Sequence, residues 1–300
     1  MTNQVYDIIN NKLIAMIEAG TAPWNKPWIG GLPVNYISRR PYSGVNLLLL
    51  PAGEYITWTQ IQNYNQIARI AGHPELQAKV KKGSKSHQIV FYTVYDKKKG
   101  KGKSEDDKDE KTFVLRYYNV FHIQDVEGLE SKYLKFENDP IEEAEKVLKD
   151  YDEVPLEHYD SLKAYYSPGL DKVNVPPKEC FPEIEYYYKT VFHEFVHSTG
   201  SSTRLKRFEK GAGSGQFASD SYSFEELVAE IGAAMLCGVT GIENKVLDNS
   251  ASYLDHWLKV LKADNKAIIR ASSKAQAAVN YILKVKAEEQ AQEVPEAIPA

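Results

Sequence analysis

Apolar side chains recur every three or four residues over several stretches of the chain, a spacing typical of helices that bury one face. The first stretch shows the pattern clearly, because Val5, Ile9 and Leu13 would lie on one side of a helix that ends at Gly20. The predicted helices span residues 4–19, 57–70, 141–150, 187–200, 223–237, 254–262 and 266–285.

Alternating apolar and polar positions predict strands in two other parts of the chain. Residues 88–95 and 112–120 have the composition of a strand pair. The segment between them, residues 96–111, consists of charged residues, Gly and Ser, so we expect a mobile hairpin tip there. Residues 164–177 form two shorter strands around a Pro-Gly turn. Together with the helices, these strands predict the α+β fold class: a small mixed α/β domain followed by a mainly helical domain with a small sheet.

A polar segment near the middle of the chain indicates a domain boundary. The 300 residues exceed the usual size of one domain, and residues 132–139 are polar and precede a proline. We therefore predict an N-terminal domain over residues 1–130, a linker over 131–140 and a second domain over 141–286. The remaining residues, 287–300, are rich in Glu, Ala and Pro and are predicted to be disordered.

Charge is unevenly distributed, although the net formal charge is only −4. Residues 1–130 carry 17 Lys and Arg against 13 Asp and Glu, whereas the remaining residues carry 20 against 28. This asymmetry points to an N-terminal half that faces nucleic acid. An excess of this size does not assign a partner by itself.

Cysteine usage and the N-terminal sequence bear on the compartment. The chain has two cysteines, Cys180 and Cys237, both in apolar surroundings, which fits core residues in a reducing cytoplasm. It has no apolar run of about 18 residues, and its first residues lack the basic and apolar regions of a secretion signal. We therefore expect a cytoplasmic protein without a membrane partner.

The strongest chemical signal is an HExxH sequence, formed by His193, Glu194 and His197, inside the predicted helix 187–200. Two histidines four positions apart project from one helix face, which supplies half of a tetrahedral zinc site. Glu194 stands beside the first histidine, where a general base for a metal-bound water would lie. The sequence predicts a metallopeptidase site if a third ligand follows downstream.

Candidates for that third ligand lie in the predicted helix 223–237. Glu226 and Glu230 are four positions apart, so one could bind the metal while the other accepts a hydrogen bond from a ligand imidazole. We favour Glu226 as the ligand and Glu230 as the orienting residue. In the alternative interpretation, Glu225 and Glu226 are only first-turn carboxylates that satisfy the helix dipole, with Glu226 closing a capping box with Ser223. Glu225 points elsewhere on the helix and is expected to be solvated in its first turn.

Aromatic and basic residues are interleaved in the first 90 residues, as in grooves that bind single strands by stacking and phosphate contacts. For the two tryptophans of the segment 23–28, burial in a small core is an equally strong alternative. The candidate DNA-binding residues are Trp24, Lys26, Trp28, Tyr36, Arg39, Arg40, Tyr42, Lys81, Lys82 and Lys85.

Several sequence blocks in this order resemble the ArdC-type antirestriction proteins of plasmids and related mobile elements. In the N-terminal half the matching blocks are residues 18–24, 26–28, 33–35, 40–46, 80–83 and 118–121. In the C-terminal half they are residues 193–200, 204–205 and 225–234, followed by Trp257, Leu261, Lys262 and Asp264. The resemblance covers nearly the whole chain.

The resemblance implies a single-stranded-DNA-binding domain followed by a zincin-like metallopeptidase domain of the gluzincin kind. The implied cofactor is one Zn²⁺ ion, with another divalent metal as the alternative. The implied partners are single-stranded DNA, double-stranded DNA as a second form, and an unidentified protein or peptide substrate. Tyr222 and His256 are candidates for stabilising the oxyanion of the peptide reaction. Relatives often carry a histidine where this chain has Ser201, which puts more weight on Glu226.

Two functions of different class remain open at this point. The protein is either a metallopeptidase brought to its target by DNA, or a DNA-protecting shield whose zinc site is structural or relict. The presence of Glu194 favours an intact catalytic site, because a purely structural zinc site does not require a general base.

Overall fold

The computed structural model describes residues 2–25, 32–73, 75–96, 111–132, 140–158, 163–208, 220–244 and 251–285. All seven predicted helices are present within these ranges, some with shifted ends. The helices are α1 (Thr2–Glu18), α2 (Val45–Leu49), α3 (Trp58–Ile70), α4 (Pro140–Asp150), α5 (Ile184–Ser198), α6 (Asp220–Thr240), α7 (Ala251–Ala263) and α8 (Ala267–Ile282). The short α2 was not predicted, because residues 47–50 are a continuous apolar run without helical spacing.

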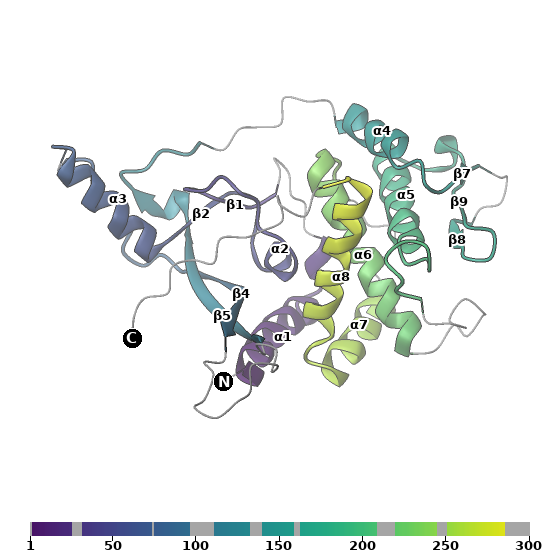
Figure 1. Cartoon of the computed structure of the whole chain (residues 1–300), viewed down its shortest axis with the longest axis horizontal. Coiled ribbons are helices and arrows are strands. Elements are labelled where there is room, and N and C mark those ends of the chain that lie inside the picture. Colours follow the sequence, from purple (N-terminus) through teal and green to yellow (C-terminus); the bar gives the residue numbers. More distant parts are fainter. Residues whose placement is uncertain are drawn as a thin grey trace, which may run out of the picture.

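The strands form three small sheets (Figure 1). The largest has the order β1 (Val34–Asn35), β2 (Glu54–Thr57), β5 (Lys111–His122) and β4 (His87–Asp96). Its long hairpin is the predicted strand pair, in register from His87 opposite Val120 to Asp96 opposite Lys111. The two smaller sheets join β3 (Lys79–Val80) to β6 (Val126–Glu127), and β7 (Leu156–Glu157) through β9 (Lys172–Asn174) to β8 (Tyr165–Ser167). The predicted α+β fold class is confirmed.

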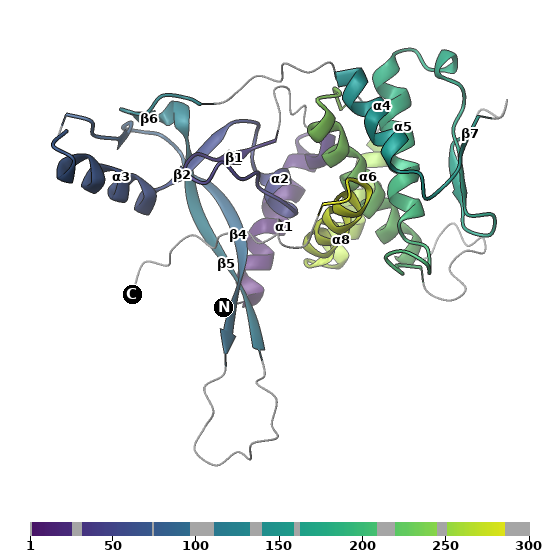
Figure 2. The same cartoon turned by 45° about the horizontal axis from the view of Figure 1, so that its top comes forward.

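In the C-terminal half, α6 packs between α5 and α8 (Figures 1 and 2). The approach of α5 to α6 depends on a glycine. A Cβ atom on Gly232 would lie 2.7 Å from Cγ2 of Val196, a distance that real side chains do not tolerate. This close approach brings the histidines of α5 opposite the glutamates of α6.

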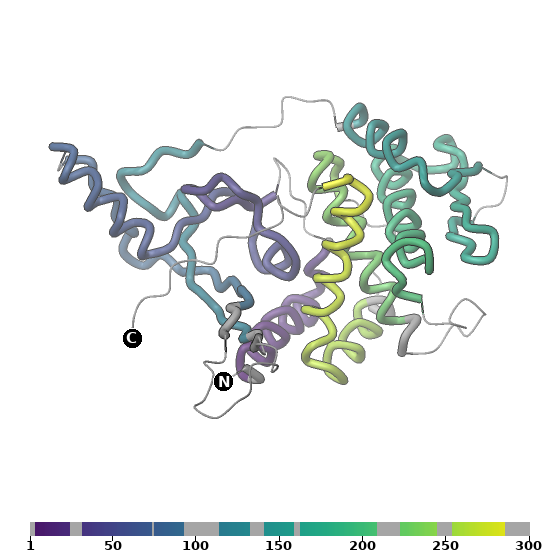
Figure 3. Tube along the Cα trace, in the orientation of Figure 1, coloured from purple at the N-terminus to yellow at the C-terminus, as the bar shows by residue number. Residues whose placement is uncertain are grey.

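One hydrophobic core runs through both halves of the chain. The N-terminal α1 packs on α7, and α2 packs on α8, so the N-terminal and C-terminal segments meet in the middle of the molecule (Figure 3). Buried hydrogen bonds reinforce the contact: Asn10 donates to the carbonyl of Leu261 at 2.8 Å, and Asn244 donates to that of Trp24 at 2.5 Å. The predicted boundary at 131–140 therefore divides the sequence, but the core continues across it.

Trp24 belongs to this shared core. Its side chain is completely buried, and its ring meets the edge of Trp257 with the centroids 5.5 Å apart. The prediction that Trp24 stacks on an unpaired base is therefore wrong, and the alternative of burial holds. Lys26 and Trp28, the hairpin tip at 97–110, linker residues 133–139 and the tail from 286 lie outside the described residues.

A second, smaller core lies at the α3 end of the molecule. It brings the β3–β6 sheet and the inner face of α3 together around six buried side chains, which are Tyr36, Ile56, Ile61, Ala78, Ile123 and Val126. The start of α3 is fixed by a capping box between Thr57 and Gln60. Within the described part of the chain, no helix combines the length and the apolar character needed to cross a membrane.

We predict that Trp24→Ala destabilises the whole chain by about 3–5 kcal/mol, because it leaves a large cavity where the two halves meet. The matched control is Trp58→Ala, whose side chain is 48 % exposed; it should cost about 0.5–1 kcal/mol. Urea unfolding followed by circular dichroism measures both. Two separate transitions, only one of them shifted by Trp24→Ala, would contradict the shared core.

Candidate metal centre

Helix α5 presents the histidine pair. Its buried face is strongly apolar and includes Val191, Phe192, Phe195 and Val196, which hold the helix in the core. His193 and His197 also face α6, where both approach Glu226. The helix ends at Thr199 in a right-handed conformation, so Gly200 does not supply the left-handed cap suggested by its place after the helix. Gly200 is needed for another reason: the ring of Phe208 lies 2.7 Å from where its Cβ would be.

Three side chains from the two helices converge on one point. The Nε2 atoms of His193 and His197 are 3.1 Å apart. The carboxylate of Glu226 lies 3.4 Å from Nε2 of His193 and 3.3 Å from Nε2 of His197. Within the described residues, these three form the one group whose ligand atoms all lie within 4.8 Å of one another. The capping-box alternative does not apply to Glu226, because α6 begins at Asp220, before Ser223.

The donor set fits a divalent cation. Tetrahedral bonds of about 2.0–2.1 Å place neighbouring donor atoms about 3.3–3.4 Å apart, close to the three distances between the ligand atoms here. Two imidazoles and one carboxylate are the protein ligands of many catalytic zinc sites, which keep a fourth position open for water. His193, His197 and Glu226 are therefore the residues that would hold the ion.

Glu194 lies on α5 beside these ligands and is buried, with 7 % of its surface exposed. Burying an ionised carboxylate costs free energy unless a positive charge or a hydrogen-bond donor compensates it. Its position beside His193 fits the predicted general base.

Behind His197 the structure places Glu225, contrary to the expectation that this residue is solvated. Its Oε1 lies 3.5 Å from Nδ1 of His197. Arg207 grips the same carboxylate through two nitrogens, with Nη2 donating at 2.7 Å and Nε at 3.1 Å. Arg207 also donates to Thr199 and to the carbonyl of Val196, so it ties the carboxylate to the end of α5. Glu225 therefore fixes the orientation of His197.

Glu230 lies behind the other histidine. Its Oε1 is 4.0 Å from Nδ1 of His193, longer than a hydrogen bond, and its Oε2 is 3.9 Å from Nζ of Lys189. The arrangement parallels that at His197: each histidine is followed in space by a carboxylate and then by a cation. The predicted orienting role of Glu230 fits this position, although the contact shown is electrostatic.

The ionisable groups of the cluster shift each other's pKa values. Burial opposes protonation of the histidines, but Glu225 and Glu226 raise the pKa of His197 to about 10, and Glu226 raises that of His193. Burial also opposes ionisation of Glu226, yet the two histidines hold its pKa well below the ordinary value. The four carboxylates exceed Arg207 and Lys189 by two negative charges, so two protons or one divalent cation would balance them.

The two oxyanion candidates are not placed in the centre. Tyr222 lies in α6, but its side chain is outside the described residues. His256 is exposed on α7, where its ring contacts Trp257 at 4.9 Å between centroids, and α7 packs on α1 and α8. The prediction that His256 stabilises the oxyanion is not supported by this position.

The N-terminal candidates fall into three groups. Tyr36 and Tyr42 are each 5 % exposed, so neither offers an open ring face to a base. Arg39 and Arg40 are both exposed, but the guanidinium of Arg39 is paired with the buried carboxylate of Glu54. Lys81, Lys82 and Lys85 are exposed in the turn between β3 and β4, as a basic phosphate-binding turn requires.

Both halves of the chain match known protein families. Residues 3–121 match the family described as the N-terminal domain of anti-restriction factor ArdC, and residues 142–274 match the zincin-like metallopeptidase family. Protein y4eC of Sinorhizobium fredii is 30 % identical over 97 % of this chain and 95 % of its own length. DNA primase TraC of Escherichia coli is 29 % identical over 93 % of this chain, but this chain spans 27 % of TraC.

Two solved structures are similar over nearly the full length. Both are of the antirestriction protein ArdC from plasmid R388, one metal-free and one Mn(II)-bound. The metal-free structure is 29 % identical, covers 93 % of this chain and 96 % of its own, and has a TM-score of 0.72. The Mn(II)-bound structure is 30 % identical, covers 93 % and 97 %, and has a TM-score of 0.70.

We predict that Glu225→Gln weakens divalent-metal binding by about 10- to 100-fold, because His197 loses the carboxylate that orients it. Titration with Zn²⁺ in a competitive chelator assay measures the affinity. Glu142→Gln, an exposed change in the first turn of α4, should leave it unchanged. An unaltered affinity in Glu225→Gln would show that Arg207 and Glu225 support the fold alone.

Proposed function

The chain belongs to the ArdC family of antirestriction proteins, and from this premise we propose that it protects the incoming DNA of a mobile element. In this proposal the N-terminal half binds single-stranded DNA in the cytoplasm. The C-terminal half carries a zinc-dependent site that hydrolyses peptide bonds. The site residues are His193, His197 and Glu226 as metal ligands, with Glu194 as the general base.

The observation that carries the hydrolytic half is the convergence of two imidazoles and a carboxylate beside a buried Glu194. A structural metal site uses all its coordination positions for the protein and has no need of a general base. Here three ligands and an adjacent carboxylate occur together, as in metallopeptidases. This combination favours catalysis over the alternative of a non-catalytic shield.

The chain's own residues have distinct tasks in this reaction. A bound divalent ion would supply Lewis acidity, which lowers the pKa of a bound water to about 7 and polarises a carbonyl. Glu194 accepts the proton of the attacking water on its carboxylate and passes it to the leaving amine. Glu225 and Arg207 hold His197, and the apolar side chains of α5 and α6 exclude bulk water from behind the centre.

We propose zinc as the metal because imidazole nitrogen together with carboxylate oxygen, in three-ligand form, is the donor set of catalytic zinc. The R388 relative has a structure with Mn(II), and manganese usually favours oxygen donors. Metal analysis of the purified protein discriminates between the two ions.

DNA as the partner of the N-terminal half is supported by its match to the ArdC N-terminal domain and by its similarity to a DNA primase. The exposed lysines at 81, 82 and 85 give it a basic turn beside the smaller core. Phosphate contacts of this kind bind strands without reading sequence. We therefore propose single strands as the main form bound, with double-stranded DNA as a second form.

We predict that Glu194→Gln lowers hydrolysis of an unfolded protein substrate such as casein by about 100-fold or more, because the proton acceptor is lost. Zinc content and single-strand binding should stay unchanged, since Gln has nearly the same shape. His193→Ala is the companion variant and should lose the metal. Hydrolysis at the wild-type rate in Glu194→Gln would refute the assigned base.

The same variant separates the two functions. If DNA protection fails in Glu194→Gln, peptide hydrolysis is required for the biology. If protection continues at the wild-type level while zinc is retained, the protein acts as a shield and hydrolysis is dispensable.

A triple change of Lys81, Lys82 and Lys85 to Gln should weaken single-strand binding and make it less sensitive to salt. Each phosphate contact contributes about 0.7 to the slope of log affinity against log salt concentration for single strands, so three contacts contribute about 2. Fluorescence anisotropy at several salt concentrations measures the slope. An unchanged slope would exclude this turn from the DNA surface.

A further inference from the structure

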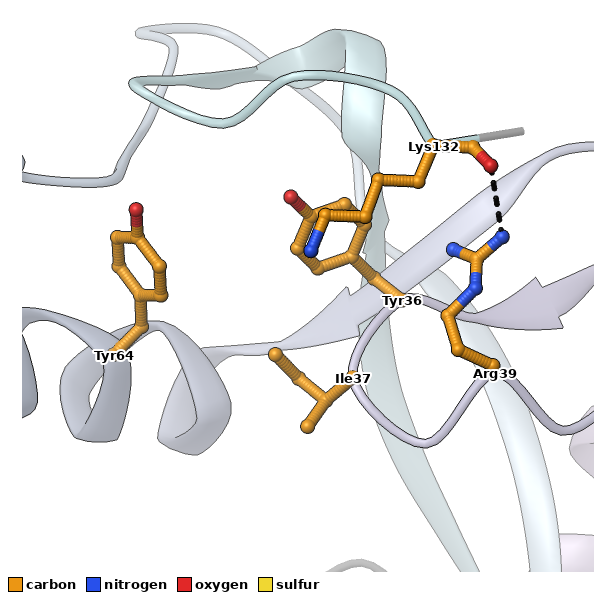
Figure 4. Close-up of a pocket in the computed structure, with 5 residues that line it drawn as sticks. All are labelled: Tyr36, Ile37, Arg39, Tyr64 and Lys132. Carbon is orange, nitrogen blue, oxygen red and sulfur yellow. Dashed lines mark hydrogen bonds between the residues drawn. The ribbon is translucent and has the colours of Figure 1, made fainter. Parts of the chain in front are cut away.

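A pocket of about 520 Å³ opens beside α3 (Figure 4). It is lined by Tyr36, Ile37, Arg39, Tyr64 and Lys132, which come from the segment after β1, from α3 and from the chain beyond β6. Its volume lies within the range of about 300–1,000 Å³ that is usual for small-ligand sites. It borders the smaller core, away from the histidine cluster.

The pocket exposes apolar and aromatic surface that the fold leaves uncovered. Ile37 is 49 % exposed although it is a large aliphatic residue. Tyr64 is half-buried on α3 and faces Tyr36 across the gap, with Ile37 beneath (Figure 4). Tyr36 is mostly covered, partly by Lys132, whose Nζ lies 5.2 Å from its ring centroid. The open surfaces are therefore the ring of Tyr64 and the side chain of Ile37.

Ile37 and Tyr64 are held relative to each other. The side-chain oxygen of Asn35 accepts hydrogen bonds at 3.0 Å from the backbone of both Ile37 and Ser38, which fixes the turn that carries Ile37. Asn35 also exchanges hydrogen bonds with Gln60, at 3.3 and 3.4 Å. Gln60 is the residue that closes the capping box of α3. The side-chain amides of Asn35 and Gln60 thus join the turn that carries Ile37 to the start of α3.

Lys132 is fixed through its backbone. The buried carboxylate of Glu54 accepts from the backbone N–H of Lys132 at 2.9 Å and from the hydroxyl of Ser131 at 2.7 Å. Arg39 pairs with the same carboxylate and donates to the carbonyl of Lys132 at 3.0 Å. Burial opposes ionisation of Glu54, but these donors keep its pKa below the ordinary value.

This network separates the two cations of the pocket. Glu54 neutralises Arg39, which is also held in a left-handed conformation at φ 62°, uncommon for a residue other than glycine. The Nζ of Lys132 lies over an aromatic ring at the exposed edge. An anion entering the pocket would therefore meet Lys132, while Arg39 keeps the pocket in shape.

We propose that the pocket takes one unpaired nucleotide of a single strand, with its base between Tyr64 and Ile37 and its phosphate on the ammonium of Lys132. An aromatic ring next to a cation suits this ligand, because every base has a face that can stack and every nucleotide has a phosphate. The proposal rests on the single-strand binding proposed above and assigns it a site. A free mononucleotide has the same chemistry, and the experiment separates the two sources.

The experiment measures binding of a fluorescent oligothymidylate on the order of a dozen nucleotides to the full-length protein by anisotropy. Loss of the ring in Tyr64→Leu should weaken binding by about 5- to 150-fold, the range of one base–aromatic stack. Tyr64→Phe keeps the ring and should bind within about 2-fold of the wild type. Lys132→Gln should lower the salt slope by about 0.7.

Two controls guard against a general loss of structure. Circular dichroism should show one cooperative melting transition for both Tyr64→Leu and Tyr64→Phe, because Tyr64 is only half-buried and both variants keep an apolar side chain on α3. Tyr165→Leu, a 41 % exposed tyrosine on β8 in the other half, should bind oligothymidylate as the wild type does.

The outcomes are distinct. If the wild type does not bind oligothymidylate, the proposed DNA function fails and the pocket assignment falls with it. If the wild type binds and Tyr64→Leu binds equally well, the DNA function stands and the pocket assignment is overturned. Thymidine monophosphate should compete only at concentrations far above the affinity for the strand. Competition at equal concentration would overturn the strand as the source and identify a mononucleotide site.

Discussion

The C-terminal half depends on burying charged groups between two apolar helices. Four carboxylates and two imidazoles lie between α5 and α6, where an unpaired charge is costly. Arg207 and Lys189 compensate part of this charge, each through the carboxylate behind one histidine. Two further positive charges are needed for balance, and the ligand atoms of the two imidazoles and Glu226 converge where a cation could supply them. Two protons or one divalent cation would restore electrostatic balance there, and the coordination geometry fits the divalent cation.

The N-terminal half packs directly against the C-terminal half that carries this centre. The two family matches divide the chain near residues 121 and 142, yet α1 lies on α7 and Trp24 lies against Trp257. The two family domains of the sequence therefore share one hydrophobic core. The metal centre adjoins the large core and the α3 end carries the smaller one, on opposite sides of the molecule (Figure 1).

Sequence periodicity predicted all seven long helices and the β4–β5 pair, because each buries one regular face. The HExxH spacing and the glutamate at 226 also follow from helix geometry, and the structure brings them together. Neighbouring helical residues diverge by about 100°, so Glu225 was expected to point away from the centre and into solvent. In the folded chain its carboxylate turns toward His197, where Arg207 holds it. Likewise, the burial of Trp24 depends on a helix more than 200 residues away.

The same limit applies to charge. A count of lysines and arginines over residues 1–130 gives Arg39 and Lys82 the same weight. In the structure Arg39 is paired with the buried Glu54, whereas Lys82 is exposed in a turn. Glu54 is fully buried at the start of a short strand. Its sequence neighbours do not indicate that its carboxylate pairs with Arg39 and accepts a hydrogen bond from the backbone of Lys132. Because the buried carboxylate neutralises one cation and positions another, the charge of this surface is set by Glu54 as much as by the basic residues themselves.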